Sequence, residues 1–196
     1  MSIRLPAAAR RQQLLDVARD VFAERGFHAT SMDDIAEAAG VTKPVLYQHF
    51  VNKRALYTEL LEDVGVRLVE EITAATSAVG SGREQVARGF EAYFGFVTEN
   101  RSAFRLIFGA SVRNDAEFAM VAERVIGQVA EVISPLIAVE APPEQRLVLA
   151  HAVVGMAEAT SRRVVADGAA PADAATLGRW LAELAWYGLR GIRSDT

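Results

Sequence analysis

Apolar residues recur at the spacing of an α-helix along almost the whole chain, and this periodicity limits the possible fold more than any other feature. Leu14, Ala18, Val21 and Phe22 lie at i, i+4, i+7 and i+8, a stripe as wide as the core-facing side of a globular helix. No strict two-residue alternation of apolar and polar residues, the signature of a half-buried strand, persists. The sequence therefore predicts an all-α fold.

Start and stop signals divide this pattern into about nine helices. Ser31 is a good N-cap, with Asp34 three residues later, where a capping box usually carries Glu or Gln. Gly26 and Gly40 each follow a periodic segment and favour a helix end there. The expected helices cover residues 8–25, 32–39, 43–50, 53–78, 83–99, 101–111, 115–138, 143–167 and 173–192.

The composition excludes several classes of protein. The chain has no cysteine, which excludes disulfides, thiolate metal sites and cysteine nucleophiles. No apolar run approaches the length of a membrane span, and the N-terminus lacks the apolar segment of a signal peptide. We therefore expect a soluble, cytoplasmic protein with no membrane partner.

The charge is unevenly distributed between the two ends of the chain. Residues 1–54 carry eight basic and six acidic residues, a net charge of +2, whereas residues 55–196 carry 13 basic and 19 acidic residues, a net charge of −6. Contact with a polyanion should therefore be confined to the first segment. The sequence therefore divides into two expected domains, at 1–54 and 55–196.

Residues 32–50 predict two short helices joined by a tight turn. Ala36 is small enough for the two helices to approach closely, and Gly40 can adopt the positive φ angle that reverses the chain. This arrangement is typical of a helix-turn-helix motif, whose second helix enters the major groove of DNA. Helical domains that bind no DNA also contain short helices with small residues, so the pattern alone leaves both interpretations open.

The expected helix 43–50 has two different faces. Leu46 and Phe50 point inward at the angular spacing of a helix, so Pro44 and Gln48 point away from the core. The outward face is small, polar and aromatic, with a single lysine. A solvated face normally carries more charge, whereas these groups suit hydrogen bonds to base edges and contacts with thymine methyl groups.

Side chains around this face complete a predicted DNA-binding surface. Tyr47, His49 and Lys53 flank it and are predicted to contact phosphates, as are the hydroxyls of Thr30 and Ser31 at a helix N-terminus. Each also has a structural interpretation, namely packing for the two rings, solvation for the lysine and capping for the hydroxyls. The predicted DNA-binding residues are Thr30, Ser31, Thr42, Lys43, Pro44, Val45, Tyr47, Gln48, His49 and Lys53.

Residues 21–61, VFAERGFHATSMDDIAEAAGVTKPVLYQHFVNKRALYTELL, closely resemble the AcrR-like DNA-binding head of TetR-family transcriptional regulators. The matching pieces are F-x-x-x-G-F/Y, T-S/T-x-x-x-I-A, A-G-V-x-x-x-x-L-Y-x-H-F and the N-K that follows. The resemblance implies a three-helix DNA-binding head, here residues 1–54, and a helical ligand-binding and dimerisation body, here residues 55–196. A homodimer formed by the last two helices is implied as well. It also implies base-edge contacts from Lys43, Pro44 and Val45, and phosphate contacts from Thr30, Tyr47, His49 and Lys53.

A second resemblance concerns the middle of the chain. The segment AFRLIFGASVRNDAEFA (103–119), with FVTENR before it and VVGM (153–156) after it, is similar to actinobacterial TetR-type regulators of fatty-acid synthesis. Those regulators sense long acyl chains carried on coenzyme A. The similarity implies an acyl chain or acyl-CoA as one candidate for a small apolar effector.

Aromatic and apolar residues also form stripes on the expected helices of the body. Core filling is the default interpretation of such stripes, and the alternative is a ligand pocket, because such pockets are mostly apolar. The candidate pocket residues are Phe94, Phe104, Phe108, Phe118 and Met156.

The expected helices 143–167 and 173–192 are the predicted dimer interface. A terminal helix that is apolar on more than one face is usually buried against a partner. Two such helices from each subunit would form a four-helix interface. The candidate interface residues are Leu147, Val154, Leu177, Trp180, Leu181 and Leu184.

Signals for catalysis and for metal or cofactor binding are missing from the sequence. The three histidines are scattered, and no nucleophile elbow or phosphate-cradling glycine loop occurs. We therefore expect no enzyme but a homodimeric, ligand-responsive repressor that binds a near-palindromic operator in double-stranded DNA and is released by a small apolar effector. The alternatives are an acyl-CoA-responsive activator of lipid genes and, in a different class, a helical interaction module or an enzyme that does not bind DNA.

Overall fold

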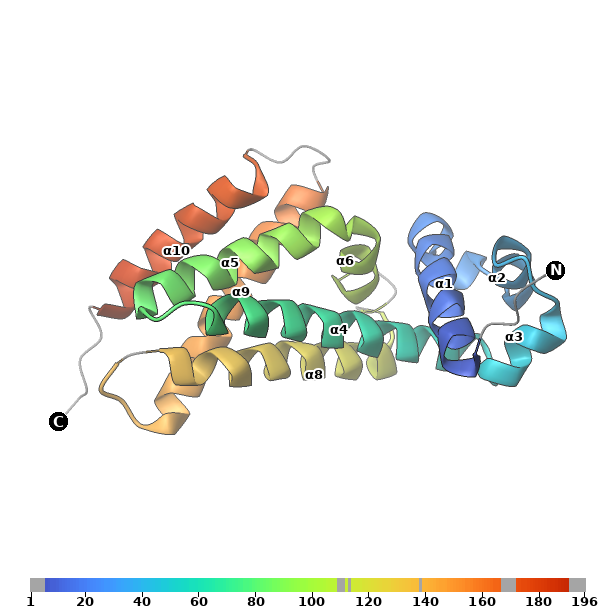
Figure 1. The fold of residues 1–196 in the computed structure, drawn as a ribbon, viewed down its shortest axis with the longest axis horizontal. Helices are drawn as coiled ribbons and strands as arrows, with labels where there is room; N and C mark the ends of the chain where they lie inside the picture. Colours follow the sequence, from blue (N-terminus) through green and yellow to red (C-terminus); the bar gives the residue numbers. More distant parts are fainter. Residues whose placement is uncertain (1–5, 109–111, 113, 138, 167–171, 191–196) are drawn as a thin grey trace. The chain divides into compact units, whose positions relative to one another are not determined.

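The structure is a computed structural model that describes residues 6–108, 112, 114–137, 139–166 and 172–190. Within these residues the chain forms nine α-helices and one 3-10 helix, and no strand (Figure 1). The all-α fold predicted from the helical periodicity is confirmed. No helix in the described ranges combines the length and the apolar character that crossing a membrane requires.

Most of the helices begin and end within one residue of the expected positions. The observed elements are α1 (Ala7–Ala29), α2 (Met32–Ala38), α3 (Lys43–His49), α4 (Lys53–Ser77), α5 (Gly82–Glu99), α6 (Arg101–Phe108), α8 (Ala116–Ile133), η1 (Ser134–Leu136), α9 (Pro143–Ala166) and α10 (Ala174–Arg190). The expected extension of the sixth helix over 109–111 lies outside the described residues. The α1 and α8 helices differ from expectation at their C-terminal ends.

The α1 helix is interrupted at Gly26, where the expected helix ends. Gly26 has a φ angle of 80° and a ψ angle of 164°, and a further helical turn follows as far as Ala29. A side chain with a Cβ atom strongly disfavours a positive φ, so glycine is the residue that permits this kink. The helix therefore continues four residues beyond the expected end, in a new direction.

The α8 helix ends at Ile133, and the expectation of a helix as far as residue 138 was wrong in its last turn. Residues Ser134–Leu136 form the short 3-10 helix η1 instead. Pro135 explains the difference, because a proline inside a helix lacks the amide N–H and clashes with the preceding turn. The chain then becomes extended at Ile137.

The chain divides into two compact units, one within residues 1–64 and 102–122 and the other within 65–101 and 123–196. The α4 and α8 helices each contribute residues to both units without an intervening loop. The division between 1–54 and 55–196 was a prediction about roles, and it stays a prediction.

An aromatic cluster forms the core of the first unit. Phe22, Phe27, Tyr57 and Phe118 pack together, with ring centroids 4.6 Å apart for Tyr57 and Phe118 and 5.0 Å apart for Phe22 and Tyr57. The Tyr57 hydroxyl donates to the carbonyl oxygen of Leu106 at 3.4 Å. The α1, α4, α6 and α8 helices therefore share one core in this unit.

The α5 and α10 helices lie side by side in the second unit (Figure 1). Their close approach depends on Gly178, since a Cβ atom there would lie 3.1 Å from the backbone nitrogen of Glu91. Phe90, Tyr93 and Phe94 of α5 are buried. This packing places one face of α5 against α10 and other residues of α5 at a cavity described below.

Candidate DNA-binding surface and ligand cavity

A capping box fixes the start of α2. The Ser31 hydroxyl accepts a hydrogen bond from the Asp34 amide at 3.1 Å, and the Asp34 carboxylate accepts one from the Ser31 amide at 2.8 Å. These bonds with Ser31, helped by the Arg25 guanidinium 3.0 Å from Asp34, hold the pKa of the Asp34 carboxyl below its usual range. The capping role expected of Ser31 is confirmed, and the shorter Asp replaces the usual Glu or Gln.

A Schellman turn connects α2 to α3. Gly40 has a φ angle of 63°, its amide donates to Glu37 at 3.0 Å, and the Val41 amide donates to Ala36 at 3.0 Å. These two hydrogen bonds define the motif and need a left-handed residue between them. The positive φ expected at Gly40 is confirmed, and Ala36 is buried at the contact between the helices.

The α3 helix buries one face and exposes the other. Leu46 is 0% exposed and Phe50, which follows the helix, is 2% exposed, as the periodicity predicts. The predicted outward residues Thr42, Lys43, Pro44, Tyr47 and Gln48 are all exposed, whereas Val45 and His49 are half-buried. The Thr42 side chain makes no capping hydrogen bond, so its hydroxyl is available to another group.

The Lys43 ammonium has an acidic partner on the neighbouring helix. It lies 2.9 Å from the Asp33 carboxylate of α2. This partner raises the pKa of Lys43, chiefly through the hydrogen bond with Asp33. The expected approach of Lys43 to base edges stays a prediction. To make that contact, the ammonium must leave Asp33 or contact Asp33 and the nucleotide together.

Thr30 and Lys53 serve the fold in places where phosphate contacts were predicted. Thr30 is 2% exposed and its hydroxyl donates to the Gly26 carbonyl at 2.8 Å. The Lys53 ammonium donates to the carbonyls of Phe27 and Thr30, each at 2.7 Å, and lies 4.5 Å from the centroid of the Phe27 ring. In this structure these groups support the α1–α2 turn, and their phosphate contacts stay a prediction.

Two arginines, Arg11 and Arg54, pack beside the predicted DNA-binding surface. Neither was among the functional residues predicted from the sequence. Arg11 on α1 forms an ion pair with Glu59 on α4, donates to the His49 carbonyl and lies 4.4 Å above the Phe50 ring. Its guanidinium therefore connects three helices around the end of α3. No local pattern marks this role, because the partners lie 38 and 48 residues away in the sequence.

Arg54 connects the start of α4 with the start of α8. Its guanidinium lies 2.8 Å from the Asp115 carboxylate, 2.9 Å from Glu117 and 4.8 Å from the Phe118 ring centroid. The hydrogen bond from Arg54 lowers the pKa of Asp115. The α3 residues predicted to contact phosphates and this ion-pair cluster thus belong to one compact unit.

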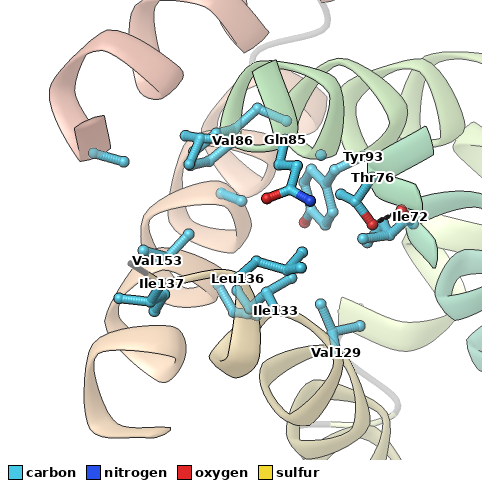
Figure 2. A pocket seen from close by; sticks show the side chains of 15 residues that line it. Ile72, Thr76, Gln85, Val86, Tyr93, Val129, Ile133, Leu136, Ile137 and Val153 are labelled. Atoms are coloured by element: carbon cyan, nitrogen blue, oxygen red, sulfur yellow. Dashed lines mark hydrogen bonds between the residues drawn. The ribbon is translucent and has the colours of Figure 1, made fainter. Parts of the chain in front are cut away.

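The second unit contains an apolar cavity of about 70 Å³ (Figure 2). Its polar lining consists of Thr76, Gln85 and Tyr93, and no charged side chain lines it among the described residues. The other lining residues are Ile72, Val86, Gly89, Phe90, Val129, Ile133, Leu136, Ile137, Val153, Val154, Ala157 and Ala185. They come from α4, α5, α8, η1, α9 and α10 and from the segment after η1.

None of the five residues predicted to line a ligand pocket borders this cavity. Phe94, Phe104 and Phe118 are buried, Phe108 and Met156 are half-buried, and Phe104 and Phe108 pack against each other 4.6 Å apart. Phe118 belongs to the aromatic core of the first unit. The pocket at these positions stays a prediction, and the structure offers the cavity of the second unit in addition.

The candidate interface residues of α9 and α10 separate into two groups. Val154 and Leu177 are buried within the subunit, and Leu147 and Leu181 are half-buried. Trp180 and Leu184 are 50% and 62% exposed, and Tyr187, which follows at the same helical spacing, is 64% exposed. These last three form the exposed apolar stripe of α10. Packing against α5 explains why Leu177 faces inward.

Within the described ranges, no three His, Asp or Glu side chains lie together in a group that could hold a metal ion. The described residues instead combine a helix-turn-helix, whose second helix is exposed, with an apolar cavity in an all-α chain. These features define a helix-turn-helix DNA-binding transcriptional regulator.

Comparison with protein families identifies the family. The model of bacterial regulatory proteins of the tetR family matches residues 14–60, and that of the tetracyclin repressor-like C-terminal domain matches residues 82–188. The chain belongs to the TetR family of transcriptional regulators, as the sequence motifs predict. It is therefore a regulator and not an enzyme.

Individual relatives agree with this assignment. The transcriptional activator FasR of Mycolicibacterium smegmatis is 44% identical over 105 residues, 54% of this chain and 48% of FasR, so the match spans about half of that relative. A TetR-like regulator from Rhodococcus sp. RHA1 is 34% identical, with 96% of this chain and 100% of that one covered and a TM-score of 0.76. FadR from Bacillus subtilis, solved in complex with stearoyl-CoA, shares the fold, with a TM-score of 0.78, 17% identity and coverage of 93% and 99%.

Proposed function

We propose that this regulator acts as a homodimer in the cytoplasm, binds a near-palindromic operator through α3, and changes its DNA affinity when a small apolar effector occupies the body. One observation carries the DNA-binding part of this proposal. The exposed face of α3 presents Pro44, Tyr47 and Gln48 with little charge, which is the chemistry that reads base edges rather than the chemistry of a solvated helix.

The exposed apolar stripe of α10 supports the homodimer. Trp180, Leu184 and Tyr187 are each at least half exposed on a single chain, and contiguous exposed apolar groups mark an interaction surface. A second copy of the chain would cover the stripe by a two-fold symmetric contact. Two-fold symmetry of the protein predicts two half-sites related by the same symmetry in the operator.

The cavity of the second unit supports an apolar effector. Its walls are almost entirely aliphatic and aromatic, as small-molecule sites usually are. At about 70 Å³ it is smaller than the roughly 150 Å³ that holds benzene in an engineered apolar cavity. An effector with a long chain must therefore move the walls apart, and α4 and α8, which line the cavity, continue into the first unit.

The need to move the cavity walls would couple binding of the effector to binding of the operator. A ligand that binds one arrangement of the walls more tightly than another shifts the equilibrium between them by its difference in affinity. We propose release from DNA as the result, in line with the tetracyclin repressor-like description of the body. Activation by an acyl-CoA is the second candidate, since the activator FasR is 44% identical over half of the chain.

The test of operator recognition begins with selection of bound fragments from a random DNA library. Footprints of the natural chain should show two half-sites with two-fold symmetry. Tyr47→Ala should weaken binding to selected and random duplexes by a similar factor, roughly tenfold for a lost charge-assisted phosphate contact, without loss of thermal stability.

Gln48→Ala serves as the companion variant. It should change the preferred base at one position of each half-site, because Gln48 lies on the outward face of α3. A Tyr47→Ala variant whose loss is confined to a single base position would contradict the phosphate role. An asymmetric footprint of one half-site would contradict the homodimer on DNA.

A further inference from the structure

The Tyr93 hydroxyl is a buried polar group without a hydrogen-bond partner. Tyr93 is 5% exposed, and its hydroxyl oxygen makes no hydrogen bond in the structure. Burial raises the pKa of this hydroxyl, so it carries its proton and can donate it. Leaving a buried hydroxyl unpaired costs stability, so its retention on a cavity wall needs an explanation.

No side chain of the cavity lining forms a hydrogen bond with the Tyr93 hydroxyl. Figure 2 shows the Tyr93 ring and the Gln85 amide pointing into the space between the aliphatic side chains. The Thr76 hydroxyl, the third polar group of the lining, donates to the Ile72 carbonyl of its own helix at 2.8 Å. The Ser161 hydroxyl on α9, outside the cavity lining, is fully buried and close enough to Tyr93 to oppose the rise in its pKa, but the two hydroxyls do not reach hydrogen-bond geometry.

Charged groups near Tyr93 do not enter the cavity. Glu158 and Arg162 of α9 are the charges that act on Tyr93, but they form an ion pair with each other at 3.1 Å and neither lines the cavity. An ionised carboxylate inside the cavity would therefore find no cation among the described lining residues. Burial of an unpaired charge is strongly unfavourable.

We propose that the Tyr93 hydroxyl is the hydrogen-bond donor for the effector, and that the cavity takes an apolar molecule with an uncharged oxygen, such as an alcohol or the carbonyl of an ester or thioester. The half-buried Gln85 amide is the second polar contact for that oxygen. This inference rests on the proposed function, because it names the chemical class of the ligand for the proposed effector cavity.

The first test measures thermal unfolding without ligand. Tyr93→Phe should raise the unfolding midpoint, because it removes a buried hydroxyl that the ligand-free protein leaves unpaired. Ser77→Ala, which removes a hydroxyl from an exposed side chain at the end of α4, is the control and should leave the midpoint nearly unchanged. A lower midpoint for Tyr93→Phe would show that the hydroxyl is bonded within the fold, for example to Ser161, and would overturn the proposal.

The second test measures binding of octan-1-ol and octanoate by calorimetry at neutral pH. The natural chain should bind the alcohol at least tenfold more tightly than the carboxylate of equal chain length, because the cavity holds no counter-charge. Tyr93→Phe should weaken octan-1-ol binding about two- to tenfold, the effect of one hydrogen bond, and Ser77→Ala should not. Equal or tighter binding of octanoate, or no binding of octan-1-ol, contradicts the proposed ligand class.

These measurements separate the inference from the function on which it rests. DNA binding by the ligand-free chain is measured in a separate titration without octan-1-ol. One outcome is that the titration shows no DNA binding while Tyr93→Phe shows higher stability and weaker alcohol binding. In that case the proposed regulation is wrong and the ligand class stands. If DNA binding responds to an effector but Tyr93→Phe behaves like Ser77→Ala, the inference is wrong and the proposed function stands.

Discussion

Lys43 and Lys53 are the two lysines of the chain, and their ammonium groups have different environments. Lys53 donates to backbone carbonyls at the end of α1 and at Thr30 and lies against the Phe27 ring. Lys43 is 54% exposed at its side chain and pairs with one carboxylate, that of Asp33. Exposed pairs of this kind contribute little to stability. We therefore expect Lys53 to act through the fold and Lys43 to be the lysine available to DNA.

Replacement of each lysine by methionine should separate these roles. Lys53→Met should destabilise the fold by about 1.5–3 kcal/mol, because the carbonyls that accept hydrogen bonds from the Lys53 ammonium would lose their charged donor. The slope of log binding constant against log salt concentration should stay unchanged, whereas loss of a phosphate contact lowers it by about 0.9 per contact. Equilibrium denaturation and fluorescence anisotropy at several salt concentrations provide the two measurements.

Lys43→Met is the control, since it removes the same charge from the exposed surface. It should leave stability nearly unchanged and weaken DNA binding. A smaller salt slope for Lys53→Met, at unchanged stability, would contradict the structural role. It would support the phosphate contact that the family resemblance implies for Lys53.

Side-chain direction within a helix could be predicted at this scale, whereas distant partners could not. Leu46 and Phe50 are buried because the helical period places them on one face, and the period is visible in the sequence. Lys53 bonds to Thr30, 23 residues away, and Arg54 to Asp115, 61 residues away. Local periodicity contains no information about which distant carbonyl or carboxylate lies beside a given cation.

At the scale of elements, the short α2 helix depends on its two ends. It has only seven residues, too few for stability by backbone hydrogen bonds alone. The capping box at Ser31 and Asp34 satisfies amides at its start, and the Schellman turn at Gly40 satisfies carbonyls at its end. Both devices were readable from the sequence, since each uses a residue type at a fixed spacing.

The lowered pKa of Asp34 predicts a pH dependence of stability. Because folding favours its charged form, Asp34 stabilises the fold above the pKa of an unfolded aspartate, near 4, and this contribution is lost as pH falls through the lower pKa of the folded state. Asp34→Asn should lower the unfolding midpoint at neutral pH and reduce its fall below about pH 4. Thermal unfolding between neutral and acidic pH measures both effects.

The matched control is Glu37→Gln on the same helix. It removes an exposed carboxylate that takes no part in the capping box, and it should leave the midpoint at neutral pH near that of the natural sequence. An equal loss for the two variants would mean that Asp34 acts through the net charge of α2 and not through the cap.

Helix ends were predictable where one residue decides them. Gly40 adopts the positive φ angle expected of it and α2 ends before it, whereas Gly26 kinks α1 without ending it. The end of α8 was missed although Pro135 marks it, because the apolar period continues beyond the proline in Leu136 and Ile137. At that point the missing amide N–H outweighs the periodicity.

At the scale of the whole molecule, the α10 helix has two apolar faces with different partners. Leu177, Ala182 and Ala185 are buried within the subunit. Trp180, Leu184 and Tyr187 form the exposed stripe on another side. The sequence indicated an apolar helix but did not show which residues pack against α5, since that depends on the close approach at Gly178.

Leu184→Glu should convert the dimer to a monomer. A charged side chain in the middle of the exposed stripe places an unpaired charge in the interface, which costs several kcal/mol. Light scattering after gel filtration should then give the mass of one chain, 21.2 kDa. Affinity for a two-half-site operator should fall at least tenfold, because each monomer contacts one half-site.

Met120→Glu is the control for Leu184→Glu. Met120 is 63% exposed and Leu184 is 62% exposed, so the two variants add the same charge at equal exposure. Met120→Glu should remain dimeric. A dimeric Leu184→Glu variant would mean that the subunits associate through other residues.

The position of the cavity could not be predicted from apolar stripes. Its lining comes from six helices and one connecting segment, and each contributes only one to five residues. In the sequence such residues look the same as core residues, because both are apolar at helical spacing. The distinguishing feature is an incompletely packed volume, and packing is a property of all the helices together.

The pair formed by Lys43 and Asp33 has a consequence for how the regulator is distributed along a chromosome. A carboxylate beside a lysine that is predicted to face the groove weakens attraction to any phosphate, whatever the base sequence. A genome presents about a million or more competing sites, so even a small reduction in dwell time at each random site returns many molecules to solution. We expect Asp33 to shorten the search for the operator by keeping more of the regulator free.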